Sequence, residues 1–258
     1  MEYAVCTVAA APVRKEDSHR SEMVNQLLFG ETMELLEEKG EWFRIRSLYD
    51  DYEGWLTHHL VQPLEKQQAQ APLSFVATGL VNPVQMNSGL VNIPLGASLT
   101  GFDAKSKMLW DGRSVYEGAY RDLSGTVDAG LLAGTALQWL NAPYLWGGKT
   151  FMGVDCSGFV QTVFKVLGIK LCRDAWQQAG QGRAVELAEA AEGDLAFFKN
   201  EQGRIIHVGM MLNRQEIIHA AGKVRIDTLD EEGITSRETG KRTHVFTCLR
   251  RVLQQGAQ

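Results

Sequence analysis

The sequence lacks several features that would assign it to a function class directly. Its 258 residues contain four cysteines, with no CxxC pair or other spacing typical of a metal site. There is no run of lysine or arginine and the formal net charge is -5, so no basic patch for nucleic acid is visible. No apolar stretch approaches the ~20 residues that a membrane-spanning helix needs. These absences point away from nucleic-acid-binding and integral membrane proteins, and we expect no metal and no cofactor.

The N-terminus also lacks the basic segment of a signal peptide, because residues 1–9 already have the pattern of a strand. We therefore expect a cytoplasmic protein, or a periplasmic or exported one if the N-terminus was trimmed. A hydrophobic content of 45% is that of a globular protein. The length predicts one or two domains, or three small ones. We expect the protein to be a monomer.

The segment 143–159 organises the rest of the chain. Two glycine-bearing turns lead into Asp155-Cys-Ser-Gly158, and an apolar run with helical periodicity follows at once. Gly168 supplies a stop, so Cys156 is expected at or just before the first turn of a helix. A helix start favours an anion, and we expect the thiol, with an ordinary pKa of roughly 8.5, to shift toward the nucleophilic thiolate. The alternative is a buried core cysteine, since free cysteine is among the most buried residue types.

Two histidines lie downstream in the strand-like runs 204–212 and 216–220, which a short polar turn separates. Neighbouring antiparallel strands can hold His207 and His219 on one side, so that one accepts the thiol proton and the other orients it. Either histidine alone is more often a core residue, whereas the ordered set Cys, His, His is much more specific. The same three side chains could ligate zinc with one open position, although metal motifs usually carry a close ligand pair on one element.

Four segments resemble the NlpC-type cysteine peptidases of bacterial cell-wall metabolism. They are Pro143-Tyr-Leu-Trp-Gly-Gly148, Asp155-Cys-Ser-Gly-Phe159, Glu192-Gly-Asp-Leu195 and His207-Val-Gly209. The resemblance covers residues of about 127 to 253, and we assign 127–258 to this domain. It implies a pared-down papain-like α+β fold, with Cys156 as nucleophile, His207 as general base and His219 as the orienting third member.

The same resemblance implies roles for residues around the nucleophile. Tyr144 matches the family tyrosine whose hydroxyl helps to hold the oxyanion, and Asp155 and Ser157 match residues that contact the substrate beside the nucleophile. Arg173 and Asp174 match a motif seen in the family. They could contact the distal carboxylates of the substrate or form a structural ion pair, and these two interpretations stand equal.

The residues before the catalytic domain predict two small barrels. Short strands and turns recur at even spacing over 1–63, which is typical of a small β-barrel, and the pattern leading to Gly54-Trp55 resembles a bacterial SH3 domain. Residues 64–72 are polar and flanked by prolines, which predicts a linker. Short apolar runs over 73–125 predict a second, more divergent SH3-like barrel, and the pattern of 127–141 predicts an amphipathic helix.

Barrels in front of such a domain resemble the γ-D-glutamyl-L-diamino-acid endopeptidases of murein-peptide recycling. In that group a barrel residue blocks the cleft, so that only stem peptides with a free N-terminal L-Ala fit. Recognition of an ammonium needs a carboxylate and a hydrogen-bond acceptor. Glu22 and Tyr52 match the group's pattern. The alternatives are that Glu22 is an ordinary surface acid and that Tyr52 is a turn residue.

The resemblance thus implies a peptidase that cleaves the γ-D-glutamyl bond of murein stem peptides and releases L-Ala-D-Glu. An exported hydrolase that acts on intact wall, and a non-catalytic wall-binding protein, are the alternatives.

Overall fold

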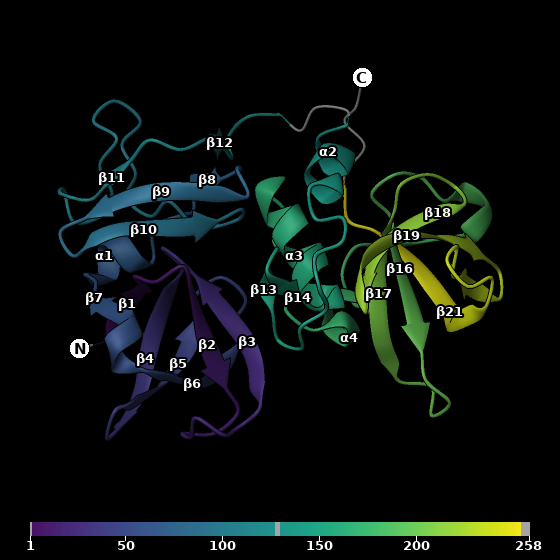
Figure 1. Cartoon of the computed structure of the whole chain (residues 1–258), viewed down its shortest axis with the longest axis horizontal. Helices are drawn as coiled ribbons and strands as arrows, with labels where there is room; N and C mark the ends of the chain where they lie inside the picture. The colour runs from purple at the N-terminus through teal and green to yellow at the C-terminus, as the bar shows by residue number, and fades with distance from the viewer. Residues whose placement is uncertain (1, 127–129, 254–258) are drawn as a thin grey trace. The chain divides into compact units, whose positions relative to one another are not determined.

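The chain divides into two compact units, both built mostly from strands (Figure 1). The computed structural model describes residues 2–126 and 130–253. The first unit comprises Met1–Thr126 together with Trp146–Phe151, and the second comprises Val127–Leu145 together with Met152–Gln258. No helix within the described ranges is long and apolar enough to cross a membrane.

The first unit begins with a seven-stranded antiparallel sheet, purple to blue in Figure 1, in the order β3-β2-β6-β5-β4-β1-β7. Alternation along β5 directs Phe43 and Ile45 into a core of small and branched side chains. The evenly spaced strands and turns expected over residues 1–63 are present. The elements are β1 (Tyr3–Cys6), β2 (Ala10–Arg14), β3 (Met23–Leu28), β4 (Thr32–Lys39), β5 (Trp42–Ser47), β6 (Glu53–Thr57), η1 (His58–Leu60) and β7 (Val61–Pro63).

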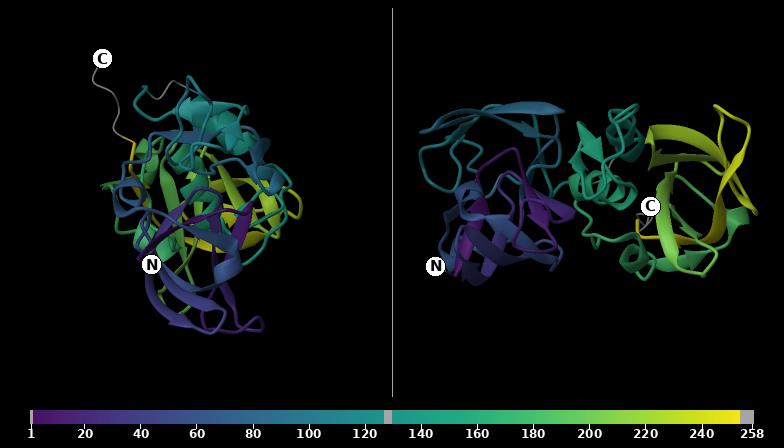
Figure 2. Two further views of the ribbon diagram at one scale, coloured as in Figure 1. Left: turned by 90° about the vertical axis from the view of Figure 1, so that its left-hand side faces the viewer. Right: turned by 60° about the horizontal axis from the view of Figure 1, so that its bottom comes forward.

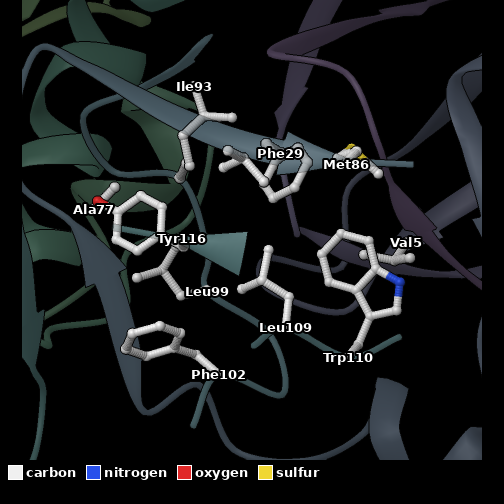
Figure 3. Packing of buried hydrophobic residues seen from close by; sticks show 12 residues of the cluster. Val5, Phe29, Ala77, Met86, Ile93, Leu99, Phe102, Leu109, Trp110 and Tyr116 are labelled. Carbon is white, nitrogen blue, oxygen red and sulfur yellow. The ribbon is translucent and has the colours of Figure 1, made fainter. Parts of the chain in front are cut away.

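Residues 73–125 form two small sheets, β10-β9-β11 and β12-β8, around one apolar cluster. Aromatic rings such as Phe102, Trp110 and Tyr116 fill this cluster (Figure 3). Val5 of β1 and Phe29, which directly follows β3, complete it. Residues 1–63 and 73–125 therefore share part of one core, which the prediction of two separate barrels did not foresee. The strands are β8 (Phe75–Ala77), β9 (Val81–Met86), β10 (Gly89–Pro94), β11 (Val115–Tyr116) and β12 (Tyr120–Asp122).

The segment 64–72, predicted as a linker, contains the short helix α1 (Lys66–Ala69) and packs on the first unit. Thr32 donates its hydroxyl to the Ala69 carbonyl at 2.9 Å, and the Gln68 amide donates to the carbonyl of Trp110 at 3.1 Å. The backbone carbonyl of Ala69 and the side chain of Gln68 therefore tie this segment to β4 and to the turn at Trp110.

A segment from far along the chain completes the first unit. Trp146–Phe151, which contains β13 (Lys149–Thr150), groups with it. The Lys149 ammonium lies 3.1 Å from Oε1 of Glu31, and both side chains are only 1% exposed. Gln26 accepts the backbone N–H of Lys149 at 2.8 Å. A Cβ at Gly147 would lie 2.5 Å from the carbonyl oxygen of Met23, so only glycine permits this close approach.

The second unit consists of helices beside a large antiparallel sheet in the order β15-β21-β16-β17-β18-β19-β20. The sheet curls back on itself because β20 also pairs with β21 (Figure 2). Helix α3 packs against β17 and β18, and α4 against β17. The helices are α2 (Leu131–Leu137), α3 (Cys156–Val166), α4 (Ala175–Gln178) and η2 (Leu187–Glu189). The strands are β14 (Gly153–Val154), β15 (Arg183–Val185), β16 (Leu195–Lys199), β17 (Ile205–Met211), β18 (Glu216–Ala221), β19 (Lys223–Asp230), β20 (Gly233–Thr235) and β21 (Arg242–Arg251).

The helix predicted over 127–141 is shorter in the structure. Helix α2 covers Leu131–Leu137, and residues 127–129 lie outside the described residues. Its Leu132 and Ala136 are buried, which gives it the core role that the apolar spacing indicated.

Candidate active site

Cys156 is the first residue of α3, as the glycine-rich approach and the apolar run predicted. Asp155 adopts an extended conformation as the N-cap residue, and its carboxylate accepts the N–H of Gly158 at 2.7 Å. The helix packs on β17, and the backbone N–H of Val208 on that strand donates to the Cys156 sulfur. The sulfur is therefore held beside the strand residue that directly follows His207.

The predicted resting thiolate is wrong. Burial raises the pKa of Cys156 to about 12, and the negative charge of Asp155 adds to the rise. Hydrogen bonds from the Val208 and Ser157 backbones and the charge of Arg173 oppose it without overcoming it. At pH 7 the thiol is therefore protonated. A helix start favours an anion, but here the side chain is 6% exposed and next to a carboxylate.

His207 on β17 and His219 on β18 lie with Nε2 of the first 2.8 Å from Nδ1 of the second. The two strands are antiparallel, with Met210 opposite Ile218. One step along this register Gly209 faces His219, and the missing side chain leaves space for the imidazole to reach toward His207. The arrangement agrees with the prediction that neighbouring strands hold both imidazoles on one side.

Asp227 on β19 extends this pair, and the sequence analysis missed it. Its Oδ2 lies 3.0 Å from Nε2 of His219 and accepts Nε–H of Arg225 at 2.8 Å. Its Oδ1 accepts the backbone N–H of Arg237 at 2.9 Å. The carboxylate is completely buried. An acidic residue in the alternating strand directly after the His219 strand was the signal available in the sequence.

The two imidazoles are held in their neutral forms. Burial lowers the pKa of His207 well below its usual value, and the nearby His219, His244 and Arg225 lower it further. Burial also lowers the pKa of His219, although the carboxylate of Asp227 opposes this change. His244 on β21 stacks on His207 with ring centroids 4.2 Å apart. A neutral imidazole can act as a general base toward a neutral thiol, and this resting state differs from a thiolate–imidazolium ion pair.

Tyr144 is half-buried and lies near the nucleophile. Burial raises its pKa, and negative charge at Cys156 and Asp155 raises it further. The hydroxyl therefore stays protonated at neutral pH and can donate a hydrogen bond to a developing oxyanion. A parallel bridge pairs Tyr144 with Val154, and Val154 is two residues before Cys156 in the sequence.

Arg173 is 1% exposed and joins the residues around the nucleophile. Its Nη1 donates to Oδ1 of Asp155 and to Oγ of Ser157, each at 3.0 Å, and Nη2 pairs with Oδ2 of Asp155. Arg173 thus forms a buried ion pair with Asp155, a partner that the sequence analysis had not considered. Asp174 is the N-cap residue of α4, and the Gln177 side chain accepts its backbone N–H at 3.2 Å.

Glu22 and Tyr52 belong to the first unit. Glu22 is exposed and immediately precedes β3, and its carboxylate accepts the indole N–H of Trp146 at 2.7 Å. Tyr52 is half-buried and directly precedes β6, and its backbone N–H donates to the carboxylate of Asp50. Both β3 and β6 pair with β2 at Arg14, so the two residues lie at the same end of the first sheet.

The zinc alternative finds no support in the ring geometry. Nε2 of His207 and Nδ1 of His219 face each other at hydrogen-bond distance, and Nε2 of His219 faces a carboxylate. Within residues 2–126 and 130–253, no group of three or more His, Cys, Asp or Glu side chains has an arrangement that could hold a metal ion.

Comparison with known proteins identifies the family. The model of the NlpC/P60 family matches residues 141–243, and that of the bacterial dipeptidyl-peptidase Sh3 domain matches residues 13–59. A gamma-D-glutamyl-L-lysine dipeptidyl-peptidase of Bacillus subtilis is 32% identical over 80% of this chain and 76% of its own length. A Bacillus cereus protein of the same name is 27% identical over 88% of this chain and 77% of its own length.

The crystal structure of an NlpC/P60 family protein from Bacillus cereus has the same fold. It superposes with a TM-score of 0.81, covering 98% of this chain and 100% of that chain at 21% identity. The family models and the Bacillus subtilis relative show that the chain belongs to the NlpC/P60 family of cysteine peptidases, and that it is a hydrolase with an SH3-like domain ahead of its catalytic domain in the sequence.

Proposed function

We propose that this protein cleaves the γ-D-glutamyl-L-diamino-acid bond of murein stem peptides that carry a free N-terminal L-Ala, and releases L-Ala-D-Glu. The observation that carries the proposal is that the Cys156 sulfur accepts the backbone N–H of Val208, the residue after His207, while His207 is hydrogen-bonded to His219. The relatives named gamma-D-glutamyl-L-lysine dipeptidyl-peptidases support the choice of bond. A helix that carries the cysteine and an antiparallel sheet that carries the histidines also support the papain-like α+β description of the domain.

The first chemical step is acylation of the enzyme. The Cys156 sulfur attacks the γ-carbonyl carbon of D-Glu while its proton moves to His207. Proton transfer coupled to attack suits a thiol whose pKa is about 12 and an imidazole that is neutral. The N–H of Cys156 and the hydroxyl of Tyr144 donate to the oxyanion. The C–N bond then breaks, and the proton on His207 passes to the leaving amine of the diamino acid.

Water completes the cycle by hydrolysing the thioester. His207 accepts a proton from water, hydroxide adds to the acyl carbon, and the sulfur leaves and takes the proton back. The products are L-Ala-D-Glu and the peptide that begins with the diamino acid. Asp155 and Ser157, held in place by Arg173, border the nucleophile and are proposed to contact the substrate. Arg173 and Asp174 are proposed to affect binding of the distal carboxylates of the substrate indirectly. Arg173 does so by holding Asp155 and Ser157, and Asp174 by capping α4.

We assign recognition of the substrate ammonium to Glu22, with Tyr52 as a further acceptor in the same sheet. Glu22 is exposed, and its hydrogen bond from Trp146 fixes the carboxylate while leaving acceptor positions on its oxygens. Trp146 lies two residues after Tyr144 in the sequence. A free amine at L-Ala exists only after the stem peptide has left the glycan, so the proposed substrate belongs to recycling rather than to intact wall.

The test compares L-Ala-γ-D-Glu-diaminopimelate, the same tripeptide with Lys in third position, and both peptides N-acetylated. We expect cleavage of the free peptides by the wild type and none by Cys156→Ala. Loss of a charge-assisted hydrogen bond costs about 1.5–3 kcal/mol, so N-acetylation or Glu22→Gln should lower kcat/KM by roughly 10- to 100-fold.

Glu16→Gln is the matched control for the amine site, because it removes the same charge from the exposed loop that precedes β3. It should leave kcat/KM unchanged. Equal cleavage of free and acetylated peptides would refute amine recognition by Glu22. Full activity of Cys156→Ala would refute the peptidase mechanism, and release of peptide from insoluble peptidoglycan at the same rate would favour the wall hydrolase.

A further inference from the structure

Three consecutive strands of the second unit carry a continuous line of polar side chains. His219 on β18 lies directly opposite Arg225 on β19, and Asp227 lies one diagonal step further along the same face. His207 on β17 stands in the same diagonal relation to His219, because Gly209 is the residue opposite His219. Each diagonal spacing brings polar atoms to hydrogen-bond distance, 2.8 Å between the imidazoles and 3.0 Å to the carboxylate.

The carboxylate of Asp227, at the end of this line, is ionised and can only accept hydrogen bonds. Burial opposes ionisation of Asp227, but hydrogen bonds from His219 and from the Arg237 backbone, with the charge of Arg225, bring its pKa to about 2. Its Oδ1 and Oδ2 each face at least one N–H donor. The ring nitrogen of His219 that faces it must therefore be the protonated one.

This requirement propagates along the line. If Nε2 of His219 carries the proton, Nδ1 of the same neutral ring is an acceptor. The nitrogen of His207 that faces it, Nε2, must then be a donor. The remaining nitrogen of His207, Nδ1, has its lone pair available. His244 stacks on the face of His207 and Arg225 lies near it, and both lower its pKa and so keep the ring neutral.

We propose that Asp227 is a positioning residue that fixes the tautomers of both imidazoles in series, and so makes Nδ1 of His207 the base for the Cys156 thiol. The inference rests on the roles proposed above for Cys156 and His207. Arg225 supplies the counter-charge that keeps a fully buried carboxylate ionised. When His207 becomes protonated during the reaction, the same fixed carboxylate stabilises the positive charge through His219.

The first experiment needs no variant. Long-range ¹⁵N–¹H spectra of the imidazoles of the wild-type protein at pH 7, without substrate, report which nitrogen of each ring carries the proton. We expect Nε2–H on both His207 and His219. A spectrum with Nδ1–H on either ring would overturn the inference.

The second experiment is Asp227→Asn, which keeps the shape of the side chain and removes its charge. The amide offers N–H groups as well as oxygen, so the tautomer of His219 is no longer fixed, and Nδ1–H forms should appear in both rings. We expect kcat to fall by about 10-fold or more, because rings in the wrong tautomer cannot accept the thiol proton, with KM nearly unchanged. Unchanged kcat and tautomers would overturn the inference.

Asp230→Asn is the matched control, because Asp230 ends the same strand and forms an ion pair with Arg242, away from the imidazoles. It should leave kcat and both tautomers as in the wild type. If Asp227→Asn lowers thermal stability and kcat but keeps both Nε2–H forms, Asp227 is merely structural. A wild type with the expected tautomers that does not cleave the tripeptide would refute the proposed function and leave the positioning role intact.

Discussion

Gly209 is the position at which a single methyl group should separate the two imidazoles. A Cβ there would lie 2.7 Å from Cδ1 of Ile217 and 2.9 Å from Cβ of His219. Carbon atoms in packed interiors are about 3.5–4.0 Å apart, so β17 and β18 would have to move apart by roughly 0.6–1 Å. The residue does not have a positive φ, so Gly209→Ala tests this contact rather than backbone strain.

The free-energy and kinetic costs follow from that displacement. Overpacking of a core by one methyl group costs about 1–3 kcal/mol, which corresponds to a fall in Tm of roughly 2–12 °C in a chain of this size. A shift of about 1 Å in a catalytic group costs on the order of 100-fold in rate, so we expect kcat to fall about 10- to 100-fold as the 2.8 Å contact lengthens. Thermal unfolding followed by circular dichroism and steady-state kinetics on the tripeptide measure the two effects.

Gly134→Ala makes the same chemical change where space is available. Gly134 is exposed in α2, and a Cβ there would have no atom within 4 Å. Alanine favours a helix over glycine by about 0.8–1.0 kcal/mol, so this variant should gain a few degrees in Tm and keep its kcat. If Gly209→Ala behaves like Gly134→Ala, the close approach of the two strands is not what holds His219 in place.

Three buried ionisable groups each have a measurable consequence. His207 must be neutral to accept a proton, and because its pKa is lowered well below 6.5, kcat/KM should decline only as the pH falls below 6.5; an acid limb at or above that value would contradict this. Since the pKa of Cys156 is raised to about 12, inactivation by iodoacetamide should accelerate steadily from about pH 7 to 10, whereas a plateau near pH 7 would reveal a resting thiolate. Lys149→Ala should destabilise the first unit by about 3–5 kcal/mol in chemical unfolding because the buried carboxylate of Glu31 loses the ammonium that balances its charge, and Lys149→Met with Glu31→Leu should recover most of that loss.

Local sequence patterns predicted the parts of the site that depend on one element. The cap, the apolar run and the glycine stop placed Cys156 at a helix start, and the two β-rich runs placed His207 and His219 on adjacent strands. Asp227 could not be assigned in this way, because its contact with His219 depends on the register between β18 and β19. The predicted lowering of the Cys156 pKa was wrong for a related reason, since burial of the thiol and its distance from the Asp155 charge are set by packing.

Strand and turn spacing predicted the fold within each region better than the boundaries between regions. The seven-stranded sheet follows the turns read from residues 1–63. Sequence patterns did not predict that Val5 and Phe29 would join the core of residues 73–125, because one is an ordinary apolar residue of β1 and the other an apolar residue in the turn after β3. They also did not predict that 64–72 would pack, since hydrogen bonds such as Thr32 to Ala69 leave no periodic signal.

The Glu31–Lys149 pair has a consequence for how the chain is made and how it can be divided. The acid is synthesised 118 positions before the base that neutralises it. Residues 1–63 therefore leave the ribosome before Lys149 is made, and we expect their sheet to gain the stability of this ion pair only after the loop ahead of the nucleophile has been translated. A fragment cut after residue 126 would bury Glu31 without the ammonium of Lys149, so we expect its sheet to be less stable than in the whole chain.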